Sequence, residues 1–259
     1  MSSIGVESEV LDRQAVEQRE PNVHRTIVGG LFYAQDAHLV PDRFVCGLAA
    51  LLESNGVSIR TSTGVTGFGI TDGRISVVDT TQGSVHAQEV VIAGGSWSSR
   101  IAKPLGIRLP IQPAKGYSIT AARPDGCPET PTMLSEAKVA VTPLGDTVRF
   151  AGTLEMTGMD LRINQRRVDA ILNAVPQYLP GLDPARLDVI ETWCGLRPCS
   201  PDGLPFLGRS SRFDNLTIAA GHAMIGISTA PITGKLVSEL VARRPTSVDL
   251  ELMRVERFA

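Results

Sequence analysis

Residues 193–208 read W-C-G-L-R-P-C-S-P-D-G-L-P-F-L-G, and this stretch sets the first expectation for the fold. Its three prolines fix φ and its three glycines admit positive φ, so the stretch predicts a rigid and irregular path. Its arginine, Arg197, carries a planar guanidinium that can bind a carboxylate through two parallel hydrogen bonds. A surface turn with a solvated arginine would explain the same pattern. The surrounding sequence has to decide between the two interpretations.

A strand, a loop of small residues and the start of a helix are predicted directly after this stretch. Leu216–Ala220 is strand-like, Gly221-His222 follows, and the last helix is expected at about 231–241, with Pro231 in its first turn. The N-terminus of a helix attracts anions, because its first amides are unpaired and the helix dipole is positive there. A phosphate and the pyrimidine edge of a reduced flavin are both candidate ligands. A turn that only solves a packing problem is the third interpretation.

The rest of the chain divides into α/β segments at both ends and a β-rich middle. Near the N-terminus, a helix that begins at Pro41 and stops at Asn55-Gly56 lies between two predicted strands, which is a β-α-β pattern. In the middle, one amphipathic helix at about 165–175 interrupts strands of an antiparallel sheet. We therefore expect a mixed α/β fold. The predicted strands are 27–33, 57–60, 75–79, 89–93, 111–121, 138–142, 147–154, 189–192 and 216–220.

Composition and spacing exclude several classes of function. The net charge is −2 and no Lys/Arg-rich run is present, so we expect no nucleic acid partner. The histidines have no metal-ligand spacing and the four cysteines form no C-x-x-C pair, so we expect no metal and reduced thiols. Ser228 lies eight residues past its strand with no histidine after it, which argues against a serine hydrolase. No apolar run reaches the length of a membrane span, and we expect a soluble, cytoplasmic protein.

Five segments, taken together and in order, resemble the D-amino-acid oxidase/dehydrogenase family of FAD-dependent oxidoreductases, and most of all its bacterial D-amino-acid dehydrogenases. Each segment is weakly specific by itself, but the five cover nearly the whole chain. They are G-G-L-F-Y-A-Q-D at 29–36, V-V-I-A-G-G-S-W at 90–97, L-P-I-Q-P-A-K-G-Y at 109–117, F-A-G-T-L-E at 150–155, and G-L-R-P at 195–198 with P-D-G at 201–203 and Gly221-His222.

The resemblance implies a role for individual residues. Arg197 matches the arginine that pairs with the substrate carboxylate, and Tyr117 is a substrate-pocket candidate that could equally be a sheet tyrosine. Val65 falls where family members contact the adenine through the main chain. The other implied cofactor-binding residues lie in two turns: Gly94, Gly95 and Trp97 in the first, and Gly221, His222, Ala223, Met224, Ile225 and Gly226 in the second.

The resemblance also implies the chemistry and the domains. FAD would accept a hydride at its N5 from the amine-bearing α-carbon of an amino acid, and the imino acid would hydrolyse to a 2-oxo acid and ammonia. No side-chain base is needed if the amine enters neutral. We expect residues 1–109 to form part of an FAD-binding domain, 110–192 a β-rich substrate domain, and 193–259 the return to the FAD-binding domain.

One departure from the family is large: the sequence contains no G-x-G-x-x-G motif. We therefore expect the chain to begin inside the family's sequence, before Pro21, and to hold at most the flavin end of FAD by itself. A subunit that needs a partner chain carrying the dinucleotide-binding unit, and an inactive product of a truncated gene, stay open as alternatives. Substrate preference, oxidase or dehydrogenase chemistry, and peripheral attachment to the inner membrane are likewise left open.

Overall fold

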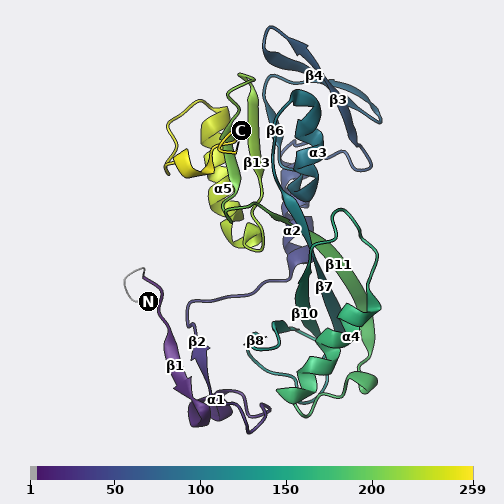
Figure 1. Ribbon diagram of the computed structural model, residues 1–259, viewed down its shortest axis with the longest axis vertical. Helices are drawn as coiled ribbons and strands as arrows, with labels where there is room; N and C mark the ends of the chain where they lie inside the picture. Colours follow the sequence, from purple (N-terminus) through teal and green to yellow (C-terminus); the bar gives the residue numbers. More distant parts are fainter. Residues whose placement is uncertain (1–4, 259) are drawn as a thin grey trace. The chain divides into compact units, whose positions relative to one another are not determined.

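The computed structural model of the protein describes residues 5–258, which divide into two compact units (Figure 1). The first unit contains the described residues up to 59 together with 116–154 and 161–195, and the second contains 60–115, 155–160 and 196 onward. Each unit is assembled from separate pieces of the chain. The fold is mixed α/β, as the sequence predicts. The functional domain limits at 109/110 and 192/193 stay a prediction.

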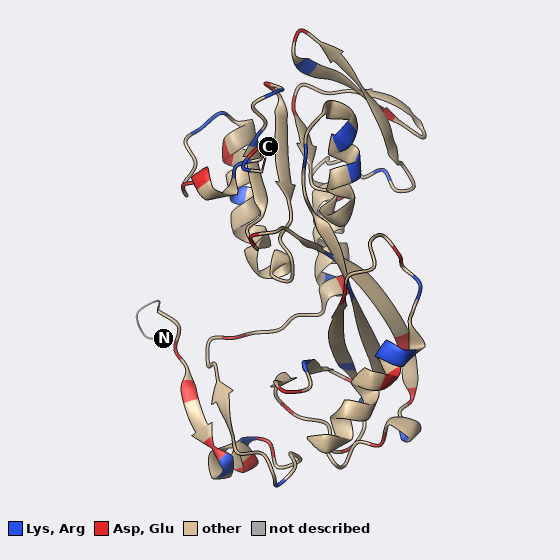
Figure 2. Cartoon of the chain, viewed as in Figure 1, with Lys and Arg blue, Asp and Glu red and all other residues tan. Residues whose placement is uncertain are grey.

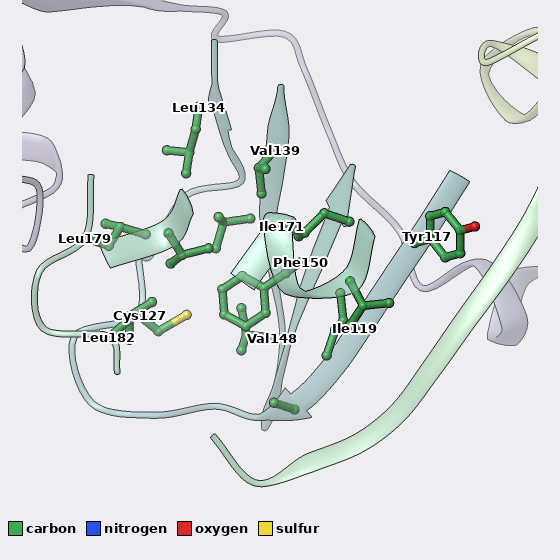
Figure 3. Packing of buried hydrophobic residues seen from close by; sticks show 14 of the residues in the cluster. Tyr117, Ile119, Cys127, Leu134, Val139, Val148, Phe150, Ile171, Leu179 and Leu182 are labelled. Carbon is green, nitrogen blue, oxygen red and sulfur yellow. The ribbon is translucent and has the colours of Figure 1, made fainter. Parts of the chain in front are cut away.

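The first unit holds most of a five-stranded sheet with the order β11-β7-β10-β9-β8. The central hairpin pairs β9 with β10 in antiparallel register, and Gly145 at φ +67° makes the turn between them. Helix α4 (Gln165–Ala174) covers the sheet with Val168 and Ile171, which pack in the same cluster as Phe150 (Figure 3). The strands are β7 (Gln112–Ala122), β8 (Thr132–Leu134), β9 (Val139–Leu144), β10 (Thr147–Glu155) and β11 (Val189–Cys199).

The N-terminal segment corrects one prediction. Strand β2 (Gly29–Phe32) forms where the sequence predicts a strand, but it pairs antiparallel with β1 (Glu9–Asp12), across the short helix α1 (Arg13–Arg19). Helix α2 (Pro41–Ser54) is confirmed, whereas residues 57–60 form no strand. A strand needs a hydrogen-bonding neighbour, and none of the described residues pairs with this run. The β-α-β interpretation of 27–60 is therefore wrong for the chain as described.

The second unit contains two three-stranded sheets. In one, with the order β12-β13-β6, β13 (Leu216–Ala220) pairs parallel with β6 (Val90–Ile92) and antiparallel with β12 (Phe206–Arg209). The other is a meander of β3 (Val65–Thr71), β4 (Arg74–Thr80) and β5 (Gly83–His86). The helices here are α3 (Ser98–Ala102), α5 (Gly226–Val241) and the 3-10 turns η2 (Gly95–Trp97), η3 (Lys103–Leu105) and η6 (Glu251–Met253).

A buried asparagine ties these two sheets together. Asn215, just before β13, accepts a hydrogen bond from the Ile75 amide at 2.9 Å and donates to the carbonyls of Ile75 and Gln88 at 2.8 and 3.0 Å. Its side chain is 1% exposed. The amide group of Asn215 thus pairs with Ile75 of β4 beyond the last β4–β5 pair, Val77 with His86.

Two further predictions need correction. Residues 193–199 are regular strand, because β11 lies at the edge of its sheet, where Pro198 can lack an amide hydrogen without breaking a central ladder. Helix α5 begins at Gly226, so Pro231 lies inside the helix and not in its first turn.

Figure 2 shows how the charged residues are distributed. Acidic and basic residues are interspersed along both units (Figure 2). Among residues 5–258, no helix is both long and apolar enough to cross a membrane.

Candidate functional site

Two loops predicted to bind the cofactor follow two neighbouring parallel strands of the second unit. Strands β6 and β13 pair through Ile92 and Ile218. The turn Gly94–Trp97 follows β6, and the segment Gly221–Gly226 follows β13. In open α/β sheets, ligands bind beyond the carboxyl ends of such parallel strands. The structure thus brings the two predicted cofactor turns to the same sheet edge.

Both turns contain residues whose backbone has a positive φ. Gly221 has φ +85° and Gly95 has φ +53°, values that glycine adopts at little cost. A Cβ added at Gly95 would meet no atom within 4 Å, so the space in front of this turn is open. Ala223 also has positive φ, at +47°, which is strained for a residue with a side chain. Such strain is often kept where a loop has to approach a ligand.

The segment that carries Arg197 is attached to both turns. The Ser96 hydroxyl donates to the carbonyl of Leu196 at 3.0 Å. On the other side, the Ala223 amide donates to the carbonyl of Pro198 at 2.9 Å. An antiparallel bridge also joins Cys199 to His222. Arg197 therefore lies between the two points at which its strand is hydrogen-bonded to the glycine turns.

The electrostatics of this region favour an anionic ligand. Arg197 is half-buried, and burial lowers the pKa of its guanidinium, which still remains protonated at neutral pH. Burial raises the pKa of the neighbouring Cys199 thiol, against the opposing effect of Arg197. Burial likewise lowers the pKa of His222, whose Nε2 lies 3.1 Å from the Thr233 hydroxyl. His222 is therefore neutral at pH 7, and Arg197 carries the positive charge.

The start of α5 offers unpaired donors beside this charge. Its N-cap residue, Ile225, provides no side-chain oxygen to the first amides of the 16-residue helix. Met224 and Ile225 are 70% and 52% exposed, so apolar side chains flank the helix start. A flat ring with an edge that becomes negative on reduction fits this combination of open turn, amides and apolar flanks. The residues present therefore fit the flavin end of FAD.

The remaining predicted site residues are placed as follows. Trp97 belongs to η2 and is 45% exposed, and Val65 begins β3, outside the three-stranded sheet of β6 and β13. Tyr117 belongs to the first unit, where it is 1% exposed at the margin of the sheet core, with its hydroxyl pointing away from the other labelled side chains (Figure 3). The roles of these three residues stay predictions.

Sequence reasoning missed two residues that hold the site together. Ser96 is buried and links its turn to the arginine strand, and Thr233 contacts His222 from the second turn of α5. Ser96 lies within the predicted Gly94–Trp97 turn, so its place in the sequence could have identified it as a site residue. No local motif identifies Thr233. Within the described part of the chain, no three His, Cys, Asp or Glu side chains are grouped as metal ligands.

Comparison with known proteins places the chain in a family. The sequence pattern of a family described as "DAO: FAD dependent oxidoreductase" matches residues 1–240. The chain belongs to this family. Members similar to it include the D-amino acid dehydrogenase of Bradyrhizobium diazoefficiens, which is 35% identical over 266 residues. The alignment covers 100% of this chain and 62% of that relative, so the chain spans less than two thirds of the relative's length.

Solved structures of the same fold extend the comparison. Glycine oxidase from Geobacillus kaustophilus is 28% identical with a TM-score of 0.92, and the match covers 99% of this chain and 68% of that one. L-proline dehydrogenase from P. horikoshii has a TM-score of 0.89 over 99% of this chain and 70% of that one, at 22% identity, and thus shows the fold alone. The names of these proteins refer to different substrates and, for the chiral ones, to different configurations of the amino acid.

Proposed function

We propose that this chain is the substrate-binding and flavin-facing part of an amino-acid oxidoreductase. The enzyme would oxidise the CH–NH2 group of a D-amino acid to an imino acid, which water then hydrolyses to a 2-oxo acid and ammonia. The names of the curated relatives support the D-configuration. The family description supports FAD as cofactor.

One observation carries the proposal: the segment of Arg197 is hydrogen-bonded to both glycine turns. The bonds from Ser96 to Leu196 and from Ala223 to Pro198 set the distance between a carboxylate-binding cation and the turns that fit a flavin ring. A substrate whose carboxylate pairs with Arg197 would be held with its α-carbon at a fixed position relative to these turns. Such fixed orientation contributes a large part of the rate acceleration of a two-partner reaction.

The residues of this chain would orient and polarise the substrate. A bound FAD would supply the two-electron acceptor for the hydride of the α-carbon. Arg197 binds the carboxylate with charge-assisted hydrogen bonds. The first amides of α5 would hold the flavin edge at which negative charge develops, and they would so favour its reduction. His222 is neutral and hydrogen-bonded to Thr233, which fixes the loop and leaves the cationic role to Arg197.

Reconstitution tests the reaction. We expect the purified chain alone to show little of the yellow absorbance of bound flavin. The same chain joined to a family-type unit with G-x-G-x-x-G should bind FAD and reduce an artificial acceptor with D-amino acids. If the joined protein binds FAD but oxidises neither D- nor L-amino acids, the proposed reaction is wrong.

Arg197 variants test the carboxylate role in that joined protein. Arg197→Ala should raise KM for amino acids by roughly 30- to 1,000-fold, since charge-assisted bonds worth about 2–4 kcal/mol are lost. FAD content should not change. Arg244→Gln, which removes an exposed arginine after α5, is the control and should leave KM unchanged. An Arg197→Ala protein with the wild-type KM would remove Arg197 from this role.

The chain alone offers a test that needs no cofactor. Cys199 lies within electrostatic range of Arg197, so the arginine should favour attack on anionic iodoacetate over neutral iodoacetamide. In a Cys46→Ser background, which removes the exposed cysteine, we expect Arg197→Gln to lower the ratio of the two alkylation rates at Cys199 at least about threefold. Arg244→Gln is again the control. An unchanged ratio would show that Arg197 does not attract carboxylates to this surface.

A second observation supports the alternative of a partner. In α2 the apolar side chains Phe44, Val45, Leu48, Leu51 and Leu52 are 39–58% exposed, and no residue of the helix is buried. Val57 and Ile59, which follow α2 in a run that forms no strand, are 46% and 41% exposed. Contiguous apolar surface of this kind usually marks a contact. We propose that a dinucleotide-binding βαβ unit, on the same or on a partner polypeptide, packs on α2 and pairs with this run.

Leu48→Asp tests this second proposal. In the joined protein, or in a complex of the chain with a separate dinucleotide-binding unit, the substitution should weaken FAD binding at least about tenfold, because it places a charge in an apolar contact. The alkylation ratio at Cys199 should stay at its wild-type value. Asp42→Asn, on the polar first turn of the same helix, is the matched control. Unchanged FAD affinity in Leu48→Asp would exclude α2 as the contact.

A further inference from the structure

A buried lysine in β7 joins the two ends of a short turn. The Lys115 side chain is 2% exposed, and its Nζ lies 3.3 Å from Asp160 Oδ2 and 3.9 Å from Glu155 Oε2. The two carboxylates are 28% and 15% exposed, so the cluster is largely shielded from water. A buried ammonium is costly unless it is paired, and losing one partner leaves an uncompensated charge. Lys115 therefore constrains where both carboxylates, and the chain between them, can lie.

The constrained chain is the turn Met156-Thr157-Gly158-Met159. Glu155 ends β10, the Thr157 amide donates to its carbonyl at 3.2 Å, and Gly158 has φ +67°. Met156 is 56% exposed. Methionine side chains are flexible and polarisable, and they adapt to apolar ligands of varied shape. The turn is thus fixed at both ends by charge and carries adaptable apolar side chains.

The turn belongs to the same compact unit as Arg197. Residues 155–160 and Lys115 cluster with 196 onward, while the neighbouring residues 154 and 161 cluster with the first unit. Strand β7, which carries Lys115, lies between β11, which carries Arg197, and β10, which leads into the turn. The Lys115 side chain therefore ties the turn to β7, and β7 is the neighbour of the strand that carries Arg197.

We propose that Lys115 is a positioning residue for substrate selection. It holds the Glu155–Asp160 turn so that Met156 and Met159 contact the side chain of the amino acid whose carboxylate Arg197 binds. This inference rests on the proposed function and adds the substrate class to it. Because the contact surface is methionine, the favoured substrates carry unbranched apolar side chains in preference to alanine-sized ones.

Selectivity of the joined, FAD-loaded protein tests this inference. The readout is the ratio of kcat/KM for D-methionine to kcat/KM for D-alanine. An apolar contact of methylene size changes such a ratio by about 10-fold or more. We expect Lys115→Met and Met156→Ala each to lower the ratio at least about fivefold. Lys115→Arg should restore the ratio, and Lys103→Met, at an exposed lysine, should not change it.

Hydrogen exchange in the chain alone gives an independent readout of the turn. Amides of 155–160 should exchange at least about tenfold faster in Lys115→Met than in wild type or Lys103→Met. Unchanged exchange overturns the inference, and so does faster exchange with an unchanged selectivity ratio, which would leave Lys115 a purely structural role. If the FAD-loaded wild-type protein oxidises no amino acid, the proposed function itself is wrong. This failure is distinguishable from a failure of the inference about Lys115, in which the wild-type protein is active.

Discussion

Replacing Asn215 tests the architecture on which the candidate site depends. The side chain of Asn215 makes three hydrogen bonds to backbone, one from the buried Ile75 amide and two to the carbonyls of Ile75 and Gln88. Asn215→Ala leaves the amide and the carbonyl of Ile75 without this partner, whereas the exposed Gln88 carbonyl still accepts from Arg74 at 3.2 Å. At about 1–3 kcal/mol for each of the two unsatisfied groups, with partial relief from entering water, we expect a loss of about 2–5 kcal/mol in the free energy of unfolding.

Equilibrium urea unfolding measures this loss. In a Trp193→Phe background, the fluorescence of Trp97 reports on the second unit alone, since the chain contains two tryptophans. Gln82→Ala is the matched control within the same unit, because its side chain donates to the Ser62 carbonyl at 3.2 Å but is exposed, and we expect a cost below about 1 kcal/mol. A loss in Asn215→Ala no larger than that of the control would refute the reasoning.

Asn215→Asp adds a pH signature to the same argument. The carboxylate can still accept from the Ile75 amide, but its second oxygen would face two carbonyl oxygens that need a donor. Protonation restores that donor, so the folded state should raise the pKa of the introduced carboxyl above its unfolded value of about 4. A raised acid pKa gives stability that is present below the unfolded pKa and lost as pH rises. The deficit against wild type should therefore grow from about pH 4 upward, and a deficit independent of pH would contradict this account.

Three further predictions concern single contacts. Arg257 lowers the pKa of Asp202 to about 2, so the pair stabilises the fold above pH 4 and loses its effect as pH falls through 2. Asp202→Asn should cost roughly 1 kcal/mol in urea unfolding at pH 7 and clearly less at pH 2. Glu20 accepts from the Glu129 and Thr130 amides at 3.0 and 2.6 Å, and Glu20→Gln, with one acceptor oxygen, should speed hydrogen exchange at both amides. Gly221→Ala should lower the thermal midpoint, because φ is +85° and the new Cβ would lie 3.1 Å from Phe206, whereas Gly234→Ala inside α5 should not.

Local signals in the sequence are sufficient for two helices, α2 and α4. Helix α2 begins at the predicted Pro41 and ends at Ser54, one residue before the predicted stop at Asn55, because the proline, the apolar spacing and the Asn-Gly pair all act within a few residues. Helix α4 follows its predicted range for the same reason. Residues 57–60 have the composition of a strand as well, but a strand also requires a neighbour, and the described residues supply none.

The candidate site was only partly predictable, because its contacts join distant segments. The sequence marks Arg197 and Gly221 as special, but no spacing rule places the Ala223 amide on the Pro198 carbonyl. For the same reason, the proline- and glycine-rich stretch predicts an irregular path, although pairing beside β7 makes residues 193–199 a strand. Pairing between distant segments decides both features, and it overrides the local preference of Gly195 and Pro198.

The two parts of the proposed cofactor site should respond differently to perturbation. Arg197 and the glycine turns are joined by backbone and serine hydrogen bonds inside one compact unit, so their relative position does not depend on α2. The exposed apolar face of α2 belongs to the other unit and contributes none of these bonds. A substitution on α2 should therefore act on FAD affinity and leave anion attraction at Arg197 intact, whereas Ser96→Ala should weaken both. A loss of anion attraction in Leu48→Asp would mean that the arginine strand is not independently held.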